Sequence, residues 1–198
     1  EGRSWMNDRL GQQAMSPLVS LWDDGCDPAG LPLPFDSEGV PRQRVQLVEN
    51  GVVCGPVYDH YTARKENRAS TGHATPGAHF FTGPMPMNVF MAGGESSVEE
   101  MIRSTERGLY ITRFWYTRSV HPRECLITGM TSDGVFWIEN GELAYPVKNL
   151  RFTQSYVAAL ANVTAASRET RVLLEEFGGG VRVPALKIAA FRFTGVTV

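Results

Sequence analysis

The sequence of 198 residues has few cysteines, no long apolar run and almost no excess of either charge. Its three cysteines, Cys26, Cys54 and Cys125, form no C-x-x-C pair, which argues against a disulfide framework or a structural zinc site and favours a reducing, cytoplasmic location. No apolar run approaches the length of a membrane span, and no signal-peptide pattern opens the chain, so we expect no membrane partner. The net charge of −2 and the lack of a basic stripe argue against direct contact with nucleic acid.

Motifs of self-contained active sites are also missing. The sequence has no H-E-x-x-H pair, no G-x-S-x-G motif and no cysteine–histidine arrangement with an identifiable partner. The glycine cluster at 178–180 precedes a strand pattern rather than a helix, so it lacks the amide groups and the dipole that hold phosphate. The acidic pairs are most simply interpreted as solvated surface: Asp23-Asp24, Glu99-Glu100 and Glu175-Glu176. The residues by themselves therefore assign no catalytic group.

Two pairs of potential metal ligands involve the histidines, which are His60, His73, His79 and His121. His73 and His79 are separated by a Pro-Gly pair, so no helix can place both on one face, although a loop could bring them together. His121 and Cys125 are separated by a proline in the same way. We interpret the first pair as exposed or structural histidines, and the second as a loop histidine and a small buried cysteine.

Glycine and proline are plentiful, with 20 and 12 residues, which indicates many turns and short connections. Two Asn-Gly pairs, Asn50-Gly51 and Asn140-Gly141, each lie between runs of alternating or β-branched apolar residues. Asn-Gly favours a two-residue type I′ turn because both positions need a positive φ, which asparagine tolerates and glycine adopts freely. The sequence therefore predicts two β-hairpins with the same turn.

The helix signals are fewer. Three N-caps are predicted, at Asp59, Ser97 and Ser155. Ser97 and Glu100 form a capping box, and Gly108 is the predicted end of that helix. The helix after Ser155 is predicted to cover most of "SYVAALANVTAAS". With roughly seven to nine short strands, two or three helices and no βαβ alternation, we predict an α+β fold. A predominantly antiparallel, curled sheet, barrel-like or sandwich, would form a single domain over residues 1–198.

The ordered series of segments carries more information than any one motif. "DSEGVPRQRVQLVENGVVCGPVYDHYTARKENRASTGHA", "ERGLYIT", "GVFWIENGELAYPVKNLRFT" and "LKIAAFRFTG" together resemble the C-terminal half of the TldD/PmbA family. Members of this family are often labelled modulators of DNA gyrase or U62-type peptidases. The resemblance covers nearly the whole chain. Because the polar start at Glu1 reads like the middle of a protein, we expect a fragment of a longer chain.

The resemblance implies a zinc metalloprotease in active members, with a His-Glu-x-x-x-His helix and a cysteine near the C-terminus as zinc ligands. That helix would lie upstream of Glu1, and "VLLEEFGGGVRVPALKI" contains no cysteine, Cys125 being the last one. The chain is therefore closer to the PmbA (TldE) type of subunit, which lacks the metal site and pairs with an active TldD subunit. We expect no catalytic residue, metal ligand or cofactor within this chain. His73 is a second departure, because asparagine is the familiar residue there.

The function implied by the resemblance is cleavage of small or unfolded polypeptides in a chamber that this domain helps to shape. Its partner would be a second copy or a TldD-like subunit, in a homodimer or a heterodimer. Two alternatives remain open: a peptide-binding or scaffold module without catalysis, and a regulator of DNA gyrase. The loop from Ser70 to Phe81 is the candidate for facing substrate, with Ser70, Thr71, Gly72 and His73 as candidate binding residues. The alternative is that this loop only covers the sheet.

Overall fold

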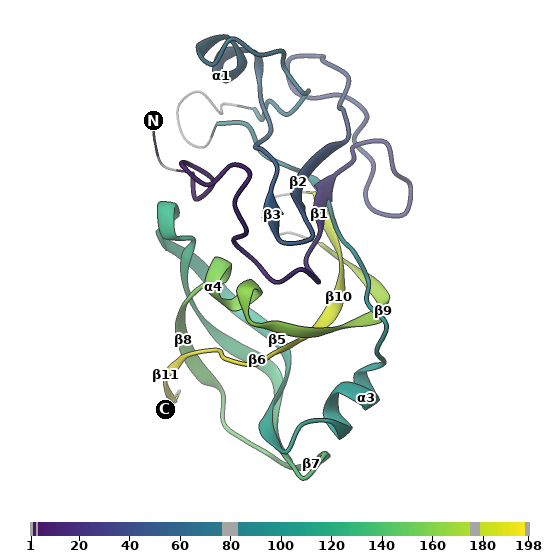
Figure 1. Ribbon diagram of the computed structural model, residues 1–198, viewed down its shortest axis with the longest axis vertical. Coiled ribbons are helices and arrows are strands. Elements are labelled where there is room, and N and C mark those ends of the chain that lie inside the picture. The colour runs from purple at the N-terminus through teal and green to yellow at the C-terminus, as the bar shows by residue number, and fades with distance from the viewer. Residues whose placement is uncertain (1, 3, 77–82, 175–178, 197–198) are drawn as a thin grey trace.

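The computed structural model describes residues 2, 4–76, 83–174 and 179–196. In this part of the chain, two β-sheets are accompanied by three α-helices and one short 3-10 helix. Figure 1 shows α1 and the first strands in the upper half of the molecule and the strands of the second sheet in the lower half. No helix among the described residues is both long and apolar enough to cross a membrane.

The first sheet has six strands in the order β3-β2-β1-β4-β10-β9. Neighbouring strands run antiparallel except β4 and β10, which are parallel. The strand bounds are β1 Leu21–Asp23, β2 Val45–Glu49, β3 Val52–Val53, β4 Asn88–Met91, β9 Val163–Leu174 and β10 Gly180–Ile188. In this sheet, strands from the first half of the chain are therefore paired with strands from its last quarter.

The second sheet has five strands, in the order β11-β8-β6-β5 with β7 also paired to β6. The bounds are β5 Arg107–His121, β6 Leu126–Glu139, β7 Glu142–Pro146, β8 Leu150–Ser155 and β11 Phe193–Val196, and a 3-10 helix, η1 Pro122–Glu124, joins β5 to β6. All of its pairs are antiparallel. The predicted α+β class with mostly antiparallel sheets is confirmed. The strands are longer and more numerous than expected, since β5 alone has 15 residues.

All three predicted N-caps are confirmed. The helices are α1 His60–Lys65, α3 Val98–Arg103 and α4 Tyr156–Ala161, and in each the side chain of the preceding residue accepts a backbone N–H of the first turn. In α3, the Ser97 hydroxyl accepts the Glu100 N–H, and the Glu100 carboxylate accepts the Ser97 N–H at 2.7 Å. The expected capping box is therefore present.

The predicted helix ends are wrong. α3 ends at Arg103, and Gly108 lies in β5, where it pairs with Ile138. The sequence after Ser155 forms only a short helix, because β9 begins at Val163 and pairs with β10. In both places pairing with a strand distant in sequence overrides local helix preference, which is a weak determinant over one or two turns.

Both Asn-Gly hairpins are confirmed. Asn50 and Gly51 have φ values of 48° and 82°, and Asn140 and Gly141 have φ values of 51° and 81°. Each turn also docks on a distant backbone. The Gly51 N–H donates to the carbonyl of Val19 at 2.7 Å, and the Gly141 N–H donates to a carbonyl just after α3 at 2.9 Å. The same turn is therefore used twice as a contact between segments far apart in sequence.

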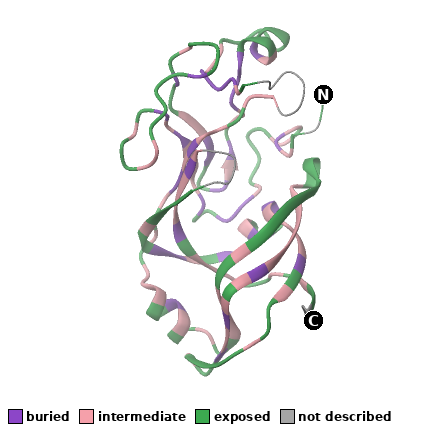
Figure 2. Cartoon of the chain, turned by 180° about the vertical axis from the view of Figure 1, so that it is seen from behind, coloured by how far each residue is buried: buried purple, intermediate pink, exposed green. Residues whose placement is uncertain are grey.

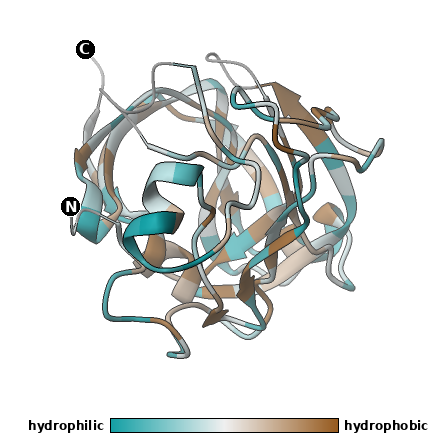
Figure 3. Ribbon diagram, turned by 90° about the horizontal axis from the view of Figure 1, so that it is seen from above, coloured by the Kyte–Doolittle hydropathy of each residue, from teal (hydrophilic) through white to brown (hydrophobic). Residues whose placement is uncertain are grey.

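The core lies where α4 packs on the first sheet. Its buried members are Met15, Val19, Val48, Met91, Val157 and Val163. A separate aromatic cluster lies at the second sheet, where the Phe152 ring contacts the rings of Phe114 and Phe191 at centroid distances of 4.7 and 5.4 Å. Figure 2 shows the buried residues concentrated around the first sheet, while long parts of the second sheet are exposed. Seen from above, the mostly hydrophilic α1 faces the viewer and hydrophobic strand segments lie behind it (Figure 3).

Candidate functional site

The predicted substrate-facing residues lie in the loop that follows α1. Ser70 and Thr71 are half-buried, whereas Gly72 is buried and the His73 side chain has no solvent exposure. Gly72 has a φ of +73°, and a Cβ at this position would collide with the backbone of Pro41. Glycine is therefore required here for a close approach between two loops. The rest of the predicted loop beyond residue 76, including His79, lies outside the described residues.

Thr71 begins a series of hydrogen-bonded groups that leads into the first sheet. The Tyr58 N–H donates to Thr71 Oγ1 at 2.8 Å, and Thr71 Oγ1 lies 2.9 Å from His73 Nδ1. His73 Nε2 lies 2.9 Å from Asp23 Oδ1 in β1. The other Asp23 oxygen accepts two backbone N–H groups at the start of β4, at 2.7 and 2.8 Å. The order hydroxyl, imidazole and carboxylate resembles that of a nucleophilic triad.

This series holds the structure together rather than presenting a nucleophile. His73 and Asp23 have no solvent exposure. The Thr71 hydroxyl is already engaged by the Tyr58 backbone as well as by His73. A hydroxyl used in this way fixes the position of its own loop. We therefore assign the series to positioning the Thr71 loop against β1 and β4.

The interpretation of Asp23 as solvated surface is wrong, because the residue is fully buried. Arg42, also buried, lies close enough to Asp23 and Asp36 to interact with both carboxylates; burial lowers the pKa of Arg42, and the two carboxylates oppose that change. Burial raises the pKa of Asp36, but three backbone N–H donors and Arg42 bring it below its ordinary value. The Asp36 carboxylate is thus held ionised by hydrogen bonds and by a buried cation.

A groove of about 380 Å³ runs beside the Thr71 loop. Four segments that are separate in sequence form it: the N-terminal turn, β2, the chain after β3 and the chain after α1. Its ten lining residues are Leu10, Val45, Gln46, Cys54, Gly55, Pro56, Tyr58, Arg68, Ala69 and Thr71. Of the four predicted binding residues, only Thr71 lines this groove. We take the groove as the candidate functional site because it adjoins the predicted loop and combines apolar with polar side chains.

Tyr58 forms part of the groove and has a perturbed hydroxyl, which donates to the Glu66 carboxylate at 2.6 Å. Burial and this carboxylate raise the pKa of Tyr58 to about 12. In a titration followed by tyrosinate absorbance, we expect one tyrosine to ionise near pH 12, above the ordinary value of about 10. Because the folded pKa is the higher one, the stabilisation is complete below about pH 10 and is lost as the pH rises towards 12.

Tyr58→Phe should remove this late ionisation step. The control is Tyr61→Phe, because Tyr61 is exposed and does not line the groove. A late step that persists in Tyr58→Phe, or that disappears in Tyr61→Phe, would assign the raised pKa to another side chain.

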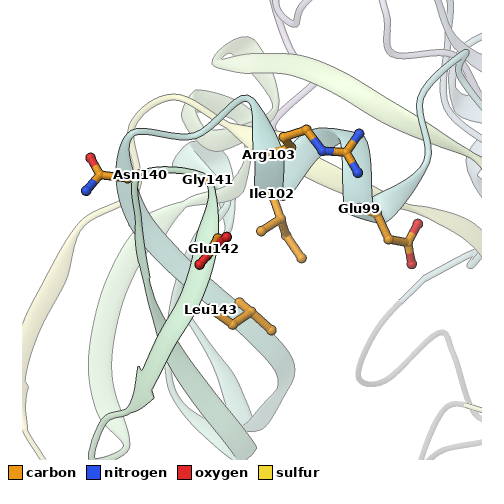
Figure 4. Close-up of a pocket in the computed structure, with 7 residues that line it drawn as sticks. All are labelled: Glu99, Ile102, Arg103, Asn140, Gly141, Glu142 and Leu143. Atoms are coloured by element: carbon orange, nitrogen blue, oxygen red, sulfur yellow. The ribbon is translucent and has the colours of Figure 1, made fainter.

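A second pocket, of about 470 Å³, lies at the second Asn-Gly hairpin. It is lined by Glu99, Ile102, Arg103, Asn140, Gly141, Glu142 and Leu143. Figure 4 shows the Ile102 and Leu143 side chains on either side of the space between α3 and β7, with the Asn140 amide pointing away. The pocket contains two carboxylates and one guanidinium, and Arg103 interacts electrostatically with Glu99. Each hairpin therefore contributes residues to a hollow, the second through its turn and the first through residues away from its turn, and the two hollows differ in charge.

Among the described residues, no group of three or more histidine, cysteine or acidic side chains could hold a metal ion. His60 Nδ1 contacts the Glu38 carboxylate at 2.9 Å, and His121 Nδ1 accepts the Glu124 N–H as the cap of η1. Cys125 packs against the core, and burial raises the pKa of its thiol, which disfavours the thiolate that binds metal. The described residues therefore do not fit the zinc site that the family resemblance implies for active members.

Sequence reasoning missed three contributors to this region. Asp23 carried no signal beyond its acidity, and nothing in the sequence linked it to His73, which lies 50 residues further along. Tyr58 and Arg68 flank the predicted loop, but only the fold places them at one groove. The available sequence signal for a binding site was the presence of Tyr58 and Arg68 in the stretch "YDHYTARKENRASTG", since tyrosine and arginine are frequent at binding sites.

Comparison with protein-family models gives one match, over residues 1–195, to the PmbA/TldA metallopeptidase C-terminal domain. Among curated relatives, the Metalloprotease PmbA of Escherichia coli O157:H7 is 30% identical over 189 residues, which is 94% of this chain and 39% of that protein. The Metalloprotease TldD homolog of Haemophilus influenzae is 27% identical over 197 residues, covering 93% of this chain and 40% of that protein. The chain thus spans about two fifths of the length of these relatives.

Solved structures with the same fold include TldE from Thermococcus kodakarensis, with a TM-score of 0.81 and 24% identity over 98% of this chain and 46% of that one. A protein from Thermotoga maritima, named as a candidate modulator of a DNA gyrase, has a TM-score of 0.79 and 26% identity over 94% of this chain and 41% of that one. The arrangement of two mostly antiparallel sheets is therefore shared by proteins with little sequence in common.

Proposed function

Because the chain belongs to the PmbA/TldD family, we propose that it is the C-terminal domain of a peptidase subunit that handles small or unfolded polypeptides in the cytoplasm. The observation that carries this proposal is the match of residues 1–195 to a metallopeptidase C-terminal domain. The relatives are named metalloproteases as whole proteins, and this chain spans about two fifths of their length. The catalytic step would therefore involve groups beyond this domain.

The subunit is of the partner type in this proposal, paired with a TldD-like subunit that binds the zinc ion. The lack of a cysteine after Cys125 supports this assignment, since zinc peptidases need three protein ligands and an open position for water. A scaffold that binds peptide without taking part in cleavage is the alternative. The role of this domain would be to shape the peptide chamber through the groove beside Thr71.

The groove accounts for substrate contact in this proposal, with Thr71 at its wall and Ser70 next to it. His73 and Gly72 are both buried, so they would affect substrate binding only by fixing the position of Thr71. A peptide in the groove would meet small and apolar residues such as Gly55, Pro56 and Ala69 and few charges, a combination that tolerates many sequences. This tolerance fits unfolded polypeptides as the substrate class.

The test uses the full-length protein, its TldD-like partner and their complex, with turnover of an unfolded peptide and zinc content measured for each. We expect turnover only when the partner is present, and zinc bound to the partner and not to this subunit. In the complex, Ala69→Trp in this subunit should lower turnover at least tenfold, because Ala69 is an exposed groove residue and an indole would fill the space.

The matched control is Ala161→Trp, an exposed alanine at the end of α4 that does not line the groove, which should leave turnover within twofold. Unchanged turnover in Ala69→Trp would show that the groove is not part of the peptide chamber. Stoichiometric zinc in the full-length subunit purified alone would contradict the partner-type assignment.

A further inference from the structure

The groove beside Thr71 carries one charged side chain. Of its ten lining residues, only Arg68 is ionic, and none is acidic. The pocket at the second hairpin has the opposite balance, with two carboxylates against one guanidinium. An anionic group is therefore favoured in the first hollow and disfavoured in the second.

Arg68 is held at the groove wall by an aromatic contact. Its guanidinium carbon lies 5.9 Å from the centre of the Tyr58 ring, and the side chain forms no ion pair with any residue that the structure describes. The nearby carboxylate of Glu66 accepts the Tyr58 hydroxyl instead and does not line the groove. Arg68 therefore has N–H donors that can bind a ligand, and the ring contact places its guanidinium beside the groove wall.

The rest of the groove suits an apolar side chain. Its lining includes Val45, Pro56 and the buried ring of Tyr58, and Leu10 stands at the rim with 51% of its surface exposed. Exposed large apolar residues beside a hollow are typical of ligand-binding surfaces. The volume of about 380 Å³ lies near the lower limit for small-molecule pockets, which favours a terminal residue over a long segment.

A single guanidinium next to apolar lining residues fits a C-terminal residue with an apolar side chain, because its free carboxylate lies directly beside that side chain. We propose that this groove binds the carboxyl terminus of a peptide, with Arg68 holding the terminal carboxylate and the apolar lining residues, among them Val45 and Pro56, holding the last side chain. Arginine suits a carboxylate because its planar fork of N–H groups can donate two parallel hydrogen bonds. This inference rests on the proposed function, and it adds the end of the peptide that is recognised.

Other anions fit the groove less well. A nucleic acid or a multiply charged phosphate would require several cations, whereas the groove offers one. An internal peptide segment could pair with Arg68 only through an aspartate or glutamate side chain, so its binding would depend on sequence. The carboxyl terminus is the only point on an unmodified polypeptide main chain that carries a negative charge.

The test measures binding of two fluorescent peptides to the full-length protein without its partner, by anisotropy. The peptides share one sequence ending in leucine, and one has a free carboxylate whereas the other has a C-terminal amide. We expect the free acid to bind at least tenfold more tightly. Arg68→Gln should reduce this difference to less than twofold while leaving the melting temperature unchanged, because Arg68 is exposed.

Arg64→Gln is the matched control, since Arg64 is an exposed arginine in the last turn of α1 that does not line the groove. The tenfold preference should persist in it. Saturable binding that is equal for the acid and the amide would overturn the C-terminal preference and leave the proposed function standing. A preference that survives Arg68→Gln would overturn the role of Arg68. Absence of any binding by either peptide would count against the proposed function as well.

Discussion

Replacing Asp23 with alanine is expected to lower the free energy of unfolding by about 3–5 kcal/mol, because several buried hydrogen-bonding groups lose their acceptor at a cost of about 1–3 kcal/mol each. Asp23 and His73 are both fully buried, with a distance of 2.9 Å between Oδ1 and Nε2. The substitution would leave the His73 ring and two backbone N–H groups at β4 without their acceptor. It would also remove one of the two carboxylates that offset the buried charge of Arg42. Each unsatisfied buried donor is costly because water cannot replace the lost hydrogen bond.

The measurement is urea unfolding followed by circular dichroism, with the slope checked for constancy between variants. The neighbouring residue provides the control: Asp24 is half-buried, and its side chain accepts the Cys26 N–H. Asp24→Ala should cost only about 1 kcal/mol, the value of one ordinary hydrogen bond. If the two alanine variants had the same free energy of unfolding, the buried hydrogen-bonded series from Thr71 to β4 would not stabilise the protein in the way that we infer.

The second large effect is expected at the first hairpin turn, where Gly51→Ala should destabilise the protein by about 2 kcal/mol more than Gly11→Ala. Both glycines have a positive φ, +82° and +74°, so both substitutions carry the strain of a left-handed backbone. A Cβ at Gly11 would meet open space, whereas a Cβ at Gly51 would collide with the carbonyl of Met15 and lie 2.7 Å from that of Ser16. The difference isolates the collision with the backbone, since overpacking in a tight site typically costs about 1–3 kcal/mol.

The same comparison applies to the second hairpin. A Cβ at Gly141 would lie 2.5 Å from the carbonyl of Arg103, so Gly141→Ala should also exceed the cost of Gly11→Ala. Urea midpoints measured under one set of conditions give all three values. Equal losses of stability in the alanine variants of Gly11, Gly51 and Gly141 would show that the turns need glycine only for their backbone angles and not for close contact with the neighbouring backbone.

Local features of the fold were predictable from the sequence because short-range chemistry decides them. The Asn50-Gly51 and Asn140-Gly141 turns follow from the need for positive φ at two successive residues. The capping box at Ser97 follows from two hydrogen bonds within four residues. The order of segments also identified the family, which the match to residues 1–195 confirms.

Other features depended on contacts that no local pattern encodes. Val163 looked helical and lies in a strand, because its pairing with Ile188 is a contact across 25 residues. Asp23 looked exposed and is buried, because its carboxylate is hydrogen-bonded to His73 and to two backbone N–H groups at the start of β4. The groove could not be predicted either, since its lining comes from four separate segments.

The sequence by itself determined the two hairpin turns, the starts of the helices, the α+β class and the family. These properties depend on backbone angles and hydrogen bonds between residues a few positions apart, or on the order of motifs along the chain. Only the tertiary structure decided which polar residues are buried and which side chains share a groove. Burial changes the free energy of a charge by several kcal/mol, and whether Asp23 or Arg68 meets water or another residue depends on strands and loops that are distant in sequence.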